Sequence, residues 1–198
     1  MLVLASKSAT RKTLLENAGI RFSVVASPID ERAIEAQILT QGANRAGLAE
    51  ELARQKALAV SAERPDALVI GADQTLDFNG TGFNKPRDRA EAAARLLQMA
   101  GTAHQLHSGV ALARNGEILW SHVESARLRF RQFSEAELET VLVLEGEAIL
   151  ASVGGYRLEG PSVRLFETIE GDYFTILGLP LLPLLAAFSQ YAPEALQP

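Results

Sequence analysis

The stretch LVLASKSATRKTLL, residues 2–15, decides the fold because it passes from strand to turn to helix within one short segment. Residues 2–5 are a short apolar run, as in a strand inside a sheet. Small hydroxyl residues follow, then the two adjacent cations Arg11 and Lys12, and a pair of leucines begins an apolar helical face. Such a turn can present hydroxyls and backbone N–H groups to an anion at the start of a helix. The simpler alternative is that Ser8 only caps the helix.

The composition fits a folded protein with a substantial core. The chain has 198 residues, 47% of them hydrophobic, and a net charge of −5. That charge argues against a sequence-independent nucleic-acid binder but allows a small anion in a local basic pocket. The absence of cysteine excludes disulfides and thiolate metal sites.

The chain gives no sign of a leader or a membrane segment. No cationic segment followed by a long apolar one opens it. Its most apolar stretch, residues 174–188, holds two prolines and is short for a membrane span. We therefore expect a cytoplasmic protein that binds neither nucleic acid nor membrane.

Helices and strands alternate early in the chain, and hairpins come late. A strand is predicted at 20–27, and a second apolar strand, which begins at Ala67, runs into Gly71 and Asp73. Helices are predicted at 44–65, from an N-cap at Asp88 to Gly101, at 134–146 and at 182–191. Ser134 and Glu137 form a capping-box pattern at the start of the third of these helices. Asn115-Gly116 marks a tight hairpin inside residues 103–133. With no internal repeat or linker, we expect one domain over residues 1–198. Its class is α/β (mixed α+β), with helices around a mixed sheet.

Asp73 is the sharpest candidate for chemistry. It follows the apolar run 67–72, and we expect it at the C-terminal end of a buried strand, where α/β sheets bind ligands. Gly71 would let a ligand or another backbone approach closely. The alternative is that Asp73 caps a turn or pairs with a nearby cation. Asp30 and Glu31 could share a divalent metal with Asp73, although such a pair is more typical of a solvated turn.

Several cations fall near the same predicted strand ends and helix starts. Lys56 lies among apolar helical residues, where a snorkelling side chain is the simpler alternative. Lys85 precedes a proline, which favours an extended backbone. With Arg11, these cations could hold phosphates, while Glu31 and Asp73 could bind a metal or activate water. This is the equipment of a nucleotide hydrolase.

The three histidines give no indication of a metal site. His104, His107 and His122 fall on the predicted hairpin without zinc-like spacing. We expect them on the strand surface and not as ligands. Serine, histidine and aspartate also form no recognisable nucleophile elbow, which argues against that type of hydrolase.

Six motifs in order resemble the Maf family of nucleoside triphosphate pyrophosphatases. They are LASKSATRKTLL at 4–15, DE at 30–31, LARQKA at 52–57, IGADQ at 70–74, NKP at 84–86 and GLPL at 178–181. The resemblance runs over nearly the whole chain. It implies an elongated mixed sheet flanked by helices, in two lobes with a central cleft, related to the inosine triphosphatase fold.

The resemblance also implies the reaction, in which a nucleoside triphosphate is hydrolysed to the monophosphate and pyrophosphate. The implied cofactor is a divalent cation, Mg²⁺ or Mn²⁺. Asp73 would be the general base, Glu31 and Asp73 would hold the metal, and the phosphate site would comprise Ser8, Arg11, Lys56 and Lys85. A homodimer is a family-level expectation. The alternative is a nucleotide-binding regulator of cell division with little turnover.

Three positions separate the branches of this family by base. The dTTP and UTP branch has Arg, Thr and Gln where this chain has Thr10, Gln74 and Glu159. Gln74 and Glu159 resemble instead the branch that acts on 7-methyl-GTP, although that branch tends to have Trp at position 10. A carboxylate at Glu159 suits guanine, whose N1–H and amine are adjacent donors. We therefore expect a guanine-type substrate bound through these three residues.

Overall fold

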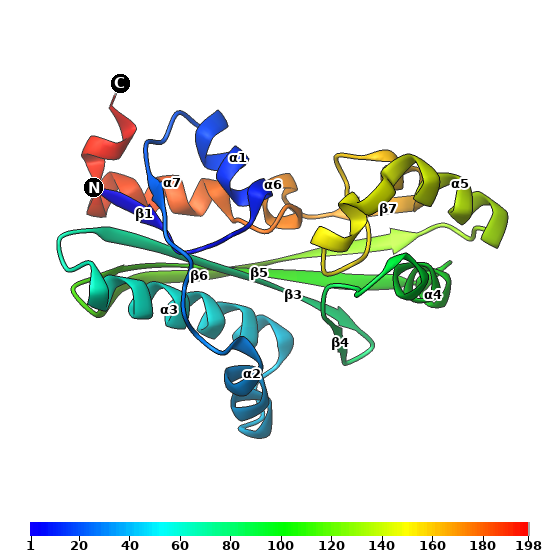
Figure 1. Ribbon diagram of the computed structural model, residues 1–198, viewed down its shortest axis with the longest axis horizontal. Coiled ribbons are helices and arrows are strands. Elements are labelled where there is room, and N and C mark those ends of the chain that lie inside the picture. Colours follow the sequence, from blue (N-terminus) through cyan, green and yellow to red (C-terminus); the bar gives the residue numbers. More distant parts are fainter. Residues whose placement is uncertain (198) are drawn as a thin grey trace. The chain divides into compact units, whose positions relative to one another are not determined.

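Figure 1 shows the computed structural model, which describes residues 1–197. Within those residues, seven strands form one mixed sheet in the order β2-β1-β3-β5-β6-β7, with β4 paired to β3. The strands are β1 (Leu2–Leu4), β2 (Ser23–Val24), β3 (Leu68–Phe78), β4 (Thr81–Phe83), β5 (Ala103–Arg114), β6 (Glu117–Phe130) and β7 (Phe166–Glu170). Strand β1 runs parallel to β2 and β3, whereas β4 and β7 pair antiparallel. The predicted mixed sheet is confirmed.

Helices α4 (Arg89–Met99) and α5 (Glu135–Glu145) begin at the caps that the sequence predicts. The other helices are α1 (Ala9–Asn17), α2 (Glu31–Thr40), α3 (Arg45–Glu63), α6 (Tyr173–Ile176) and α7 (Leu181–Tyr191), with the 3₁₀ turns η1 (Gly146–Ala151), η2 (Pro161–Leu165) and η3 (Pro193–Leu196). Asp88 caps α4, and Ser134 forms a capping box with Glu137 at the start of α5. No helix within residues 1–197 has both the length and the apolar character to cross a bilayer.

The chain divides into two compact units. The first comprises Met1–Gln74, His107–Glu124 and the chain from Asp172 onward, and the second comprises Thr75–Leu106 and Ser125–Gly171. Three of the four divisions fall inside β3, β5 and β6, and the fourth lies between β7 and α6. The predicted single domain, its elongation and its central cleft stay predictions.

Alternate residues of the first unit's strands face opposite helices. Leu4, Ile70 and Leu112 belong to a buried cluster shared with α1 and α7. Val3 and Val69 belong to another, shared with α3. Figure 1 accordingly shows α3 along one face of these strands and α1 and α7 along the other. Neighbouring residues of β3 therefore point to opposite faces of the sheet, one covered by α3 and the other by α1 and α7.

Two glycines bring the backbone of α3 unusually close to the sheet. A Cβ atom at Gly71 would lie 2.0 Å from the carbonyl oxygen of Ala53. A Cβ atom at Gly109 would lie 2.2 Å from that of Ala49. Of the two uses predicted for Gly71, the close approach of another backbone is confirmed. This approach fixes the height of Lys56 above β3.

Two local predictions need correction. The strand predicted at 20–27 is only Ser23–Val24, because its parallel partner β1 ends at Leu4, which pairs with Val24. No helix was predicted within residues 28–43, yet α2 begins at Glu31. The carboxylate of Asp30 accepts hydrogen bonds from Arg32 N and Ala33 N, so it acts as the N-cap of α2.

The surface position predicted for the histidines is wrong for two of them. His104 and His107 are buried, whereas His122 is half-buried. The reason is that β5 is covered on both faces, so alternation along it does not lead to solvent. His104 Nε2 lies 2.6 Å from the hydroxyl of Tyr156, and its ring stacks on Phe130.

Candidate active site

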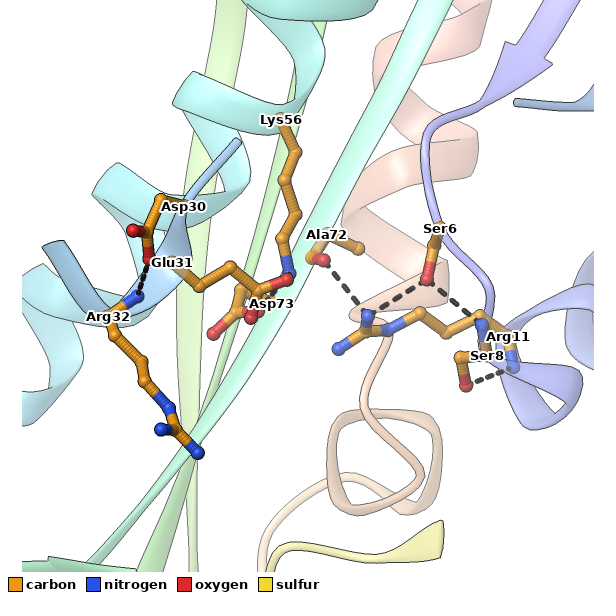
Figure 2. A network of polar contacts seen from close by, with 9 residues as sticks. All are labelled: Ser6, Ser8, Arg11, Asp30, Glu31, Arg32, Lys56, Ala72 and Asp73. Atoms are coloured by element: carbon orange, nitrogen blue, oxygen red, sulfur yellow. Dashed lines mark hydrogen bonds and ion pairs between the residues drawn. The ribbon is translucent and has the colours of Figure 1, made fainter. Parts of the chain in front are cut away.

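A buried lysine lies against two carboxylates in the first unit. Lys56 Nζ is 2.5 Å from Asp73 Oδ1 and 2.8 Å from Glu31 Oε1. Lys56 and Asp73 are each only 7% exposed, whereas the side chain of Glu31 is 56% exposed. Figure 2 shows the three side chains converging from α3, β3 and the start of α2. Snorkelling of Lys56 to solvent is therefore wrong, because its ammonium group is held at a carboxylate.

The strand that carries Asp73 does not end where the sequence predicted. β3 continues to Phe78, so Asp73 lies in mid-strand and not at its C-terminal end. Its parallel neighbour β1, however, ends with Leu4 opposite Ile70. Asp73 therefore lies beyond the C-terminal end of β1, although not at the end of its own strand. The C-terminal ends of parallel strands are where α/β sheets bind ligands.

Burial and nearby charges act on Asp73 in opposite directions. Burial raises the pKa of Asp73, the positive charges of Lys56 and Arg11 oppose that rise, and the negative charge of Glu31 adds to it. A carboxyl group with a raised pKa is a better proton acceptor than a free aspartate. Such perturbed groups are typical of catalytic sites.

Arg11 is buried on the opposite face of β3 and is held by neutral groups. Its Nε donates to the carbonyl of Gly178 at 2.7 Å. Its Nη1 donates to the carbonyl of Ala72 at 2.9 Å and to Ser6 Oγ at 3.1 Å. Burial lowers the pKa of Arg11, whereas the negative charges of Asp73 and Glu31 act to raise it. Arg11 thus joins the turn after β1, the strand β3 and the loop after α6.

The hydroxyl residues of the first turn take different positions. Ser8 is the N-cap of α1, and its Oγ accepts from Arg11 N at 3.3 Å. Ser8 therefore caps α1, and its predicted place in the phosphate site stays a prediction. Its backbone N–H donates to Ser6 Oγ at 3.2 Å, so Ser6 binds both that amide and the Arg11 guanidinium. Thr10 is half-buried in the first turn of α1.

Gln74 points to the side of β3 away from Asp73, and its amide has a fixed orientation. Its Nε2 is 2.9 Å from the carbonyl of Ile176, 3.2 Å from that of Thr175 and 3.1 Å from Ser108 Oγ. Backbone carbonyls only accept hydrogen bonds, so the nitrogen must be the end that faces them. The acceptor oxygen of Gln74 therefore lies on the opposite side of the amide.

Sequence reasoning missed the residues that hold Gln74. Ser108 Oγ donates to the carbonyl of Thr175 at 2.7 Å, and Thr175 Oγ1 donates to Glu124 Oε2 at 2.8 Å. Thr175 is the single hydroxyl residue of the apolar stretch 174–188, which could have marked it. No comparable sequence feature distinguishes Ser108 within its strand.

Two predicted site residues belong to the second unit. Lys85 is exposed after β4, and Glu159 is exposed in the loop before η2. Their predicted roles, Lys85 at the phosphates and Glu159 at the base, stay predictions. The first unit brings together Glu31, Lys56 and Asp73 on one face of β3, with Arg11 and its neighbours on the other.

Comparisons with known proteins agree with the motif resemblance. The family model described as Maf-like protein matches residues 1–191. A nucleoside triphosphate pyrophosphatase of Bradyrhizobium diazoefficiens is 53% identical over 93% of this chain and 91% of its own length. A 7-methyl-GTP pyrophosphatase of Brucella suis is 50% identical over 93% of both chains. A 7-methyl-GTP pyrophosphatase of Rhizobium meliloti is 48% identical over 94% of both.

Proposed function

The chain belongs to the Maf family, and we propose that it hydrolyses a nucleoside triphosphate to the monophosphate and pyrophosphate. The observation that carries this proposal is the buried ammonium of Lys56 between the carboxylates of Asp73 and Glu31. A protein that only bound nucleotides would have no need of a buried carboxylate with a raised pKa. The names of the similar proteins support the same reaction.

We assign the proton transfer to Asp73. Lys56 contacts Oδ1, so Oδ2 is the oxygen assigned to the attacking water. The water gives its proton to Asp73 as its oxygen bonds to the α-phosphorus, and the bond to the bridging oxygen of pyrophosphate breaks. Lys56 fixes the carboxylate and stabilises negative charge that develops on the phosphates. No covalent enzyme intermediate is required.

The donor set fits a hard divalent cation, which we propose as Mg²⁺ or Mn²⁺. Glu31 and Asp73 already bring oxygens from two elements to one positive group, the Lys56 ammonium. Within residues 1–197, no group of three His, Cys, Asp or Glu side chains could enclose a metal. Magnesium is commonly held by one or two carboxylates, with water and substrate phosphates as its other ligands. When bound, the cation would polarise the phosphoryl oxygens.

We place the triphosphate at the N-terminus of α1. No carboxylate is paired directly with the positive charge of Arg11, because its hydrogen-bond partners are neutral oxygens. The N-terminus of a helix favours the same kind of ligand. Ser8 and Thr10 lie in this turn, and Lys85 of the second unit is assigned to the phosphates from the family resemblance.

The proposed substrate is a nucleoside triphosphate with a guanine-type base, such as 7-methyl-GTP. The amide of Gln74 turns its acceptor oxygen away from the protein carbonyls, so it suits a donor on the ligand. Glu159 would supply a second acceptor. Uracil and thymine offer one ring N–H between two carbonyls. Those carbonyl oxygens are acceptors, so they would face the acceptor oxygens of Gln74 and Glu159 unfavourably. Cytoplasmic location and a homodimer stay predictions.

The test is pyrophosphate release from a panel of nucleotides that includes 7-methyl-GTP, GTP, dTTP and UTP. Each would be incubated with Mg²⁺, Mn²⁺ or a chelator, and the monophosphate identified by mass spectrometry. We expect metal-dependent turnover that is highest for guanine-type nucleotides. Tight nucleotide binding without pyrophosphate release would favour the regulatory alternative, and a preference for dTTP or UTP would overturn the assignment of the base.

A further inference from the structure

The second unit contains a buried carboxylate that the proposed reaction does not use. Glu145 is the last residue of α5, and its side chain has no exposed surface. A negative charge is unfavourable at the C-terminus of a helix, and burial adds a desolvation cost. Strong local contacts must therefore offset the cost of burying the Glu145 carboxylate.

Those contacts all come from one short segment, residues 157–162, which we name the 157–162 loop. Glu145 Oε1 accepts from Ser162 N at 2.8 Å and from Ser162 Oγ at 2.7 Å. Glu145 Oε2 accepts from Arg157 Nε at 2.8 Å and lies 2.8 Å from Arg157 Nη2. The carboxylate thus binds both ends of the loop with charge-assisted hydrogen bonds.

The middle of the loop also packs on this carboxylate. A Cβ atom at Gly160 would lie 2.7 Å from Glu145 Oε1 and 3.0 Å from Arg157 Nη2, so any larger residue there would have to displace the carboxylate. The amide of Gly160 donates to the carbonyl of Arg157, which closes a turn. Glu159 stands in this turn, exposed, directly before the glycine.

We propose that Glu145 is a positioning residue for base recognition, because it fixes the loop that presents Glu159. This proposal rests on the proposed function, in which Glu159 faces the base. An exposed carboxylate on a loose loop would have to be ordered at each binding event, whereas one held from both ends by a buried ion pair is already ordered. Glu145 itself touches no substrate.

The test compares Glu145→Gln with Glu159→Gln in the full chain. Glutamine keeps the shape of the side chain, but it removes the charge and turns an N–H₂ group towards donors of the loop. The readouts are kcat and KM for 7-methyl-GTP and for UTP. We expect Glu145→Gln to raise the KM for 7-methyl-GTP about tenfold, with kcat changed by less than about twofold, and to reduce discrimination against UTP.

A double-mutant cycle separates positioning from mere stability. If Glu145 acts through Glu159, Glu145→Gln should change discrimination little in a chain that already carries Glu159→Gln. A purely structural role would lower kcat for both nucleotides alike in either background. Ser162→Ala, which removes one contact and leaves the backbone N–H, is a milder second variant should Glu145→Gln fold poorly. Glu139→Gln, at an exposed ion pair on the same helix, is the matched control.

The outcomes distinguish this inference from the function on which it rests. A wild-type protein that releases no pyrophosphate from any nucleotide overturns both. If the wild type is active but Glu159→Gln leaves discrimination unchanged, the role of Glu159 and this inference are wrong while the reaction stands. If Glu159→Gln changes discrimination and neither Glu145→Gln nor Ser162→Ala does, this inference alone is wrong.

Discussion

The two faces of β3 hold their buried cations in different ways. On the face towards α3, the ammonium of Lys56 lies between the carboxylates of Asp73 and Glu31. On the face towards α1, the guanidinium of Arg11 donates to two backbone carbonyls and a serine hydroxyl. Figure 2 shows the two groups on either side of the strand.

The difference teaches what each face can attract. The Lys56 group has two carboxylates for one cation, so with both carboxylates ionised it has a surplus of negative charge and suits a further cation. The Arg11 group has no carboxylate among its hydrogen-bond partners, so it keeps a surplus of positive charge and suits an anion. A metal-bound triphosphate needs both kinds of site close together. The two groups contact β3 at adjacent residues, Arg11 at the backbone carbonyl of Ala72 and Lys56 at the carboxylate of Asp73.

The largest expected effect comes from Asp73→Asn, which removes the proton acceptor and keeps the shape. We expect kcat to fall about 10²–10⁴-fold, as is typical when a general base is lost. Because burial raises the pKa of Asp73, the acid limb of the wild-type pH–rate profile should lie above the range of a free aspartate. That limb should be absent in the residual activity of Asp73→Asn, measured as pyrophosphate release between about pH 4 and 9. Near-wild-type turnover would remove Asp73 from the mechanism.

Lys56→Met should have the next largest effect. It leaves the buried Asp73 without its cation, so the pKa of Asp73 should rise further and the acid limb should move to higher pH. If the charge of Lys56 faces the transferring phosphates as proposed, its loss should lower kcat about 10²–10³-fold. Lys12→Met is the matched control, because Lys12 forms an exposed ion pair with Glu16. An unshifted acid limb in Lys56→Met would show that the two side chains are not coupled.

Local chemistry made much of the fold predictable. The Asn115-Gly116 turn has φ values of 52° and 76°, as the tight hairpin requires, and both residue types tolerate them. The capping box of Ser134 and Glu137 likewise depends on residues three positions apart. Such features are encoded within a few neighbouring residues, so a pattern in the sequence is enough to find them.

The candidate site was only partly predictable, because its contacts join distant segments. The sequence pointed to Arg11 as an anion ligand, but its acceptors lie 61 and 167 positions away in Ala72 and Gly178. Motif order could bring Lys56 and Asp73 to one site, yet it could not show that Asp73 and Gln74 face opposite sides of β3. The helix after Asp30 was missed because an acidic N-cap looks like an acidic turn.

His104 adds a third case to the comparison, because its buried imidazole ring stays neutral. Burial lowers the pKa of His104 to about 4, against about 6.5 in an unfolded chain. The unfolded chain therefore binds more protons in that interval, and stability should fall as the pH falls from about 6.5 to 4. The full interval corresponds to about 3 kcal/mol.

Urea unfolding at several pH values between about 7.5 and 4 would measure this loss. His104→Gln should be less stable than the wild type at neutral pH and should show a flatter dependence on pH. His122→Gln, at the half-buried histidine, is the control. Parallel pH dependences for the wild type and His104→Gln would mean that His104 does not cause the loss.

The smallest effect, and the most direct test of the comparison, is expected from Arg11→Lys beside Arg11→Met. One ammonium group cannot reach three acceptors as the planar guanidinium does, so both variants should lose about 1–3 kcal/mol of stability. Lysine keeps the positive charge and methionine does not. If Arg11 serves the triphosphate through its charge, KM should rise less in Arg11→Lys than in Arg11→Met. We expect the KM of the methionine variant to be about fivefold to tenfold higher than that of the lysine variant. Equal KM values in two variants of equal stability would mean that Arg11 only joins three segments of the fold, and that the positive face of β3 attracts no substrate.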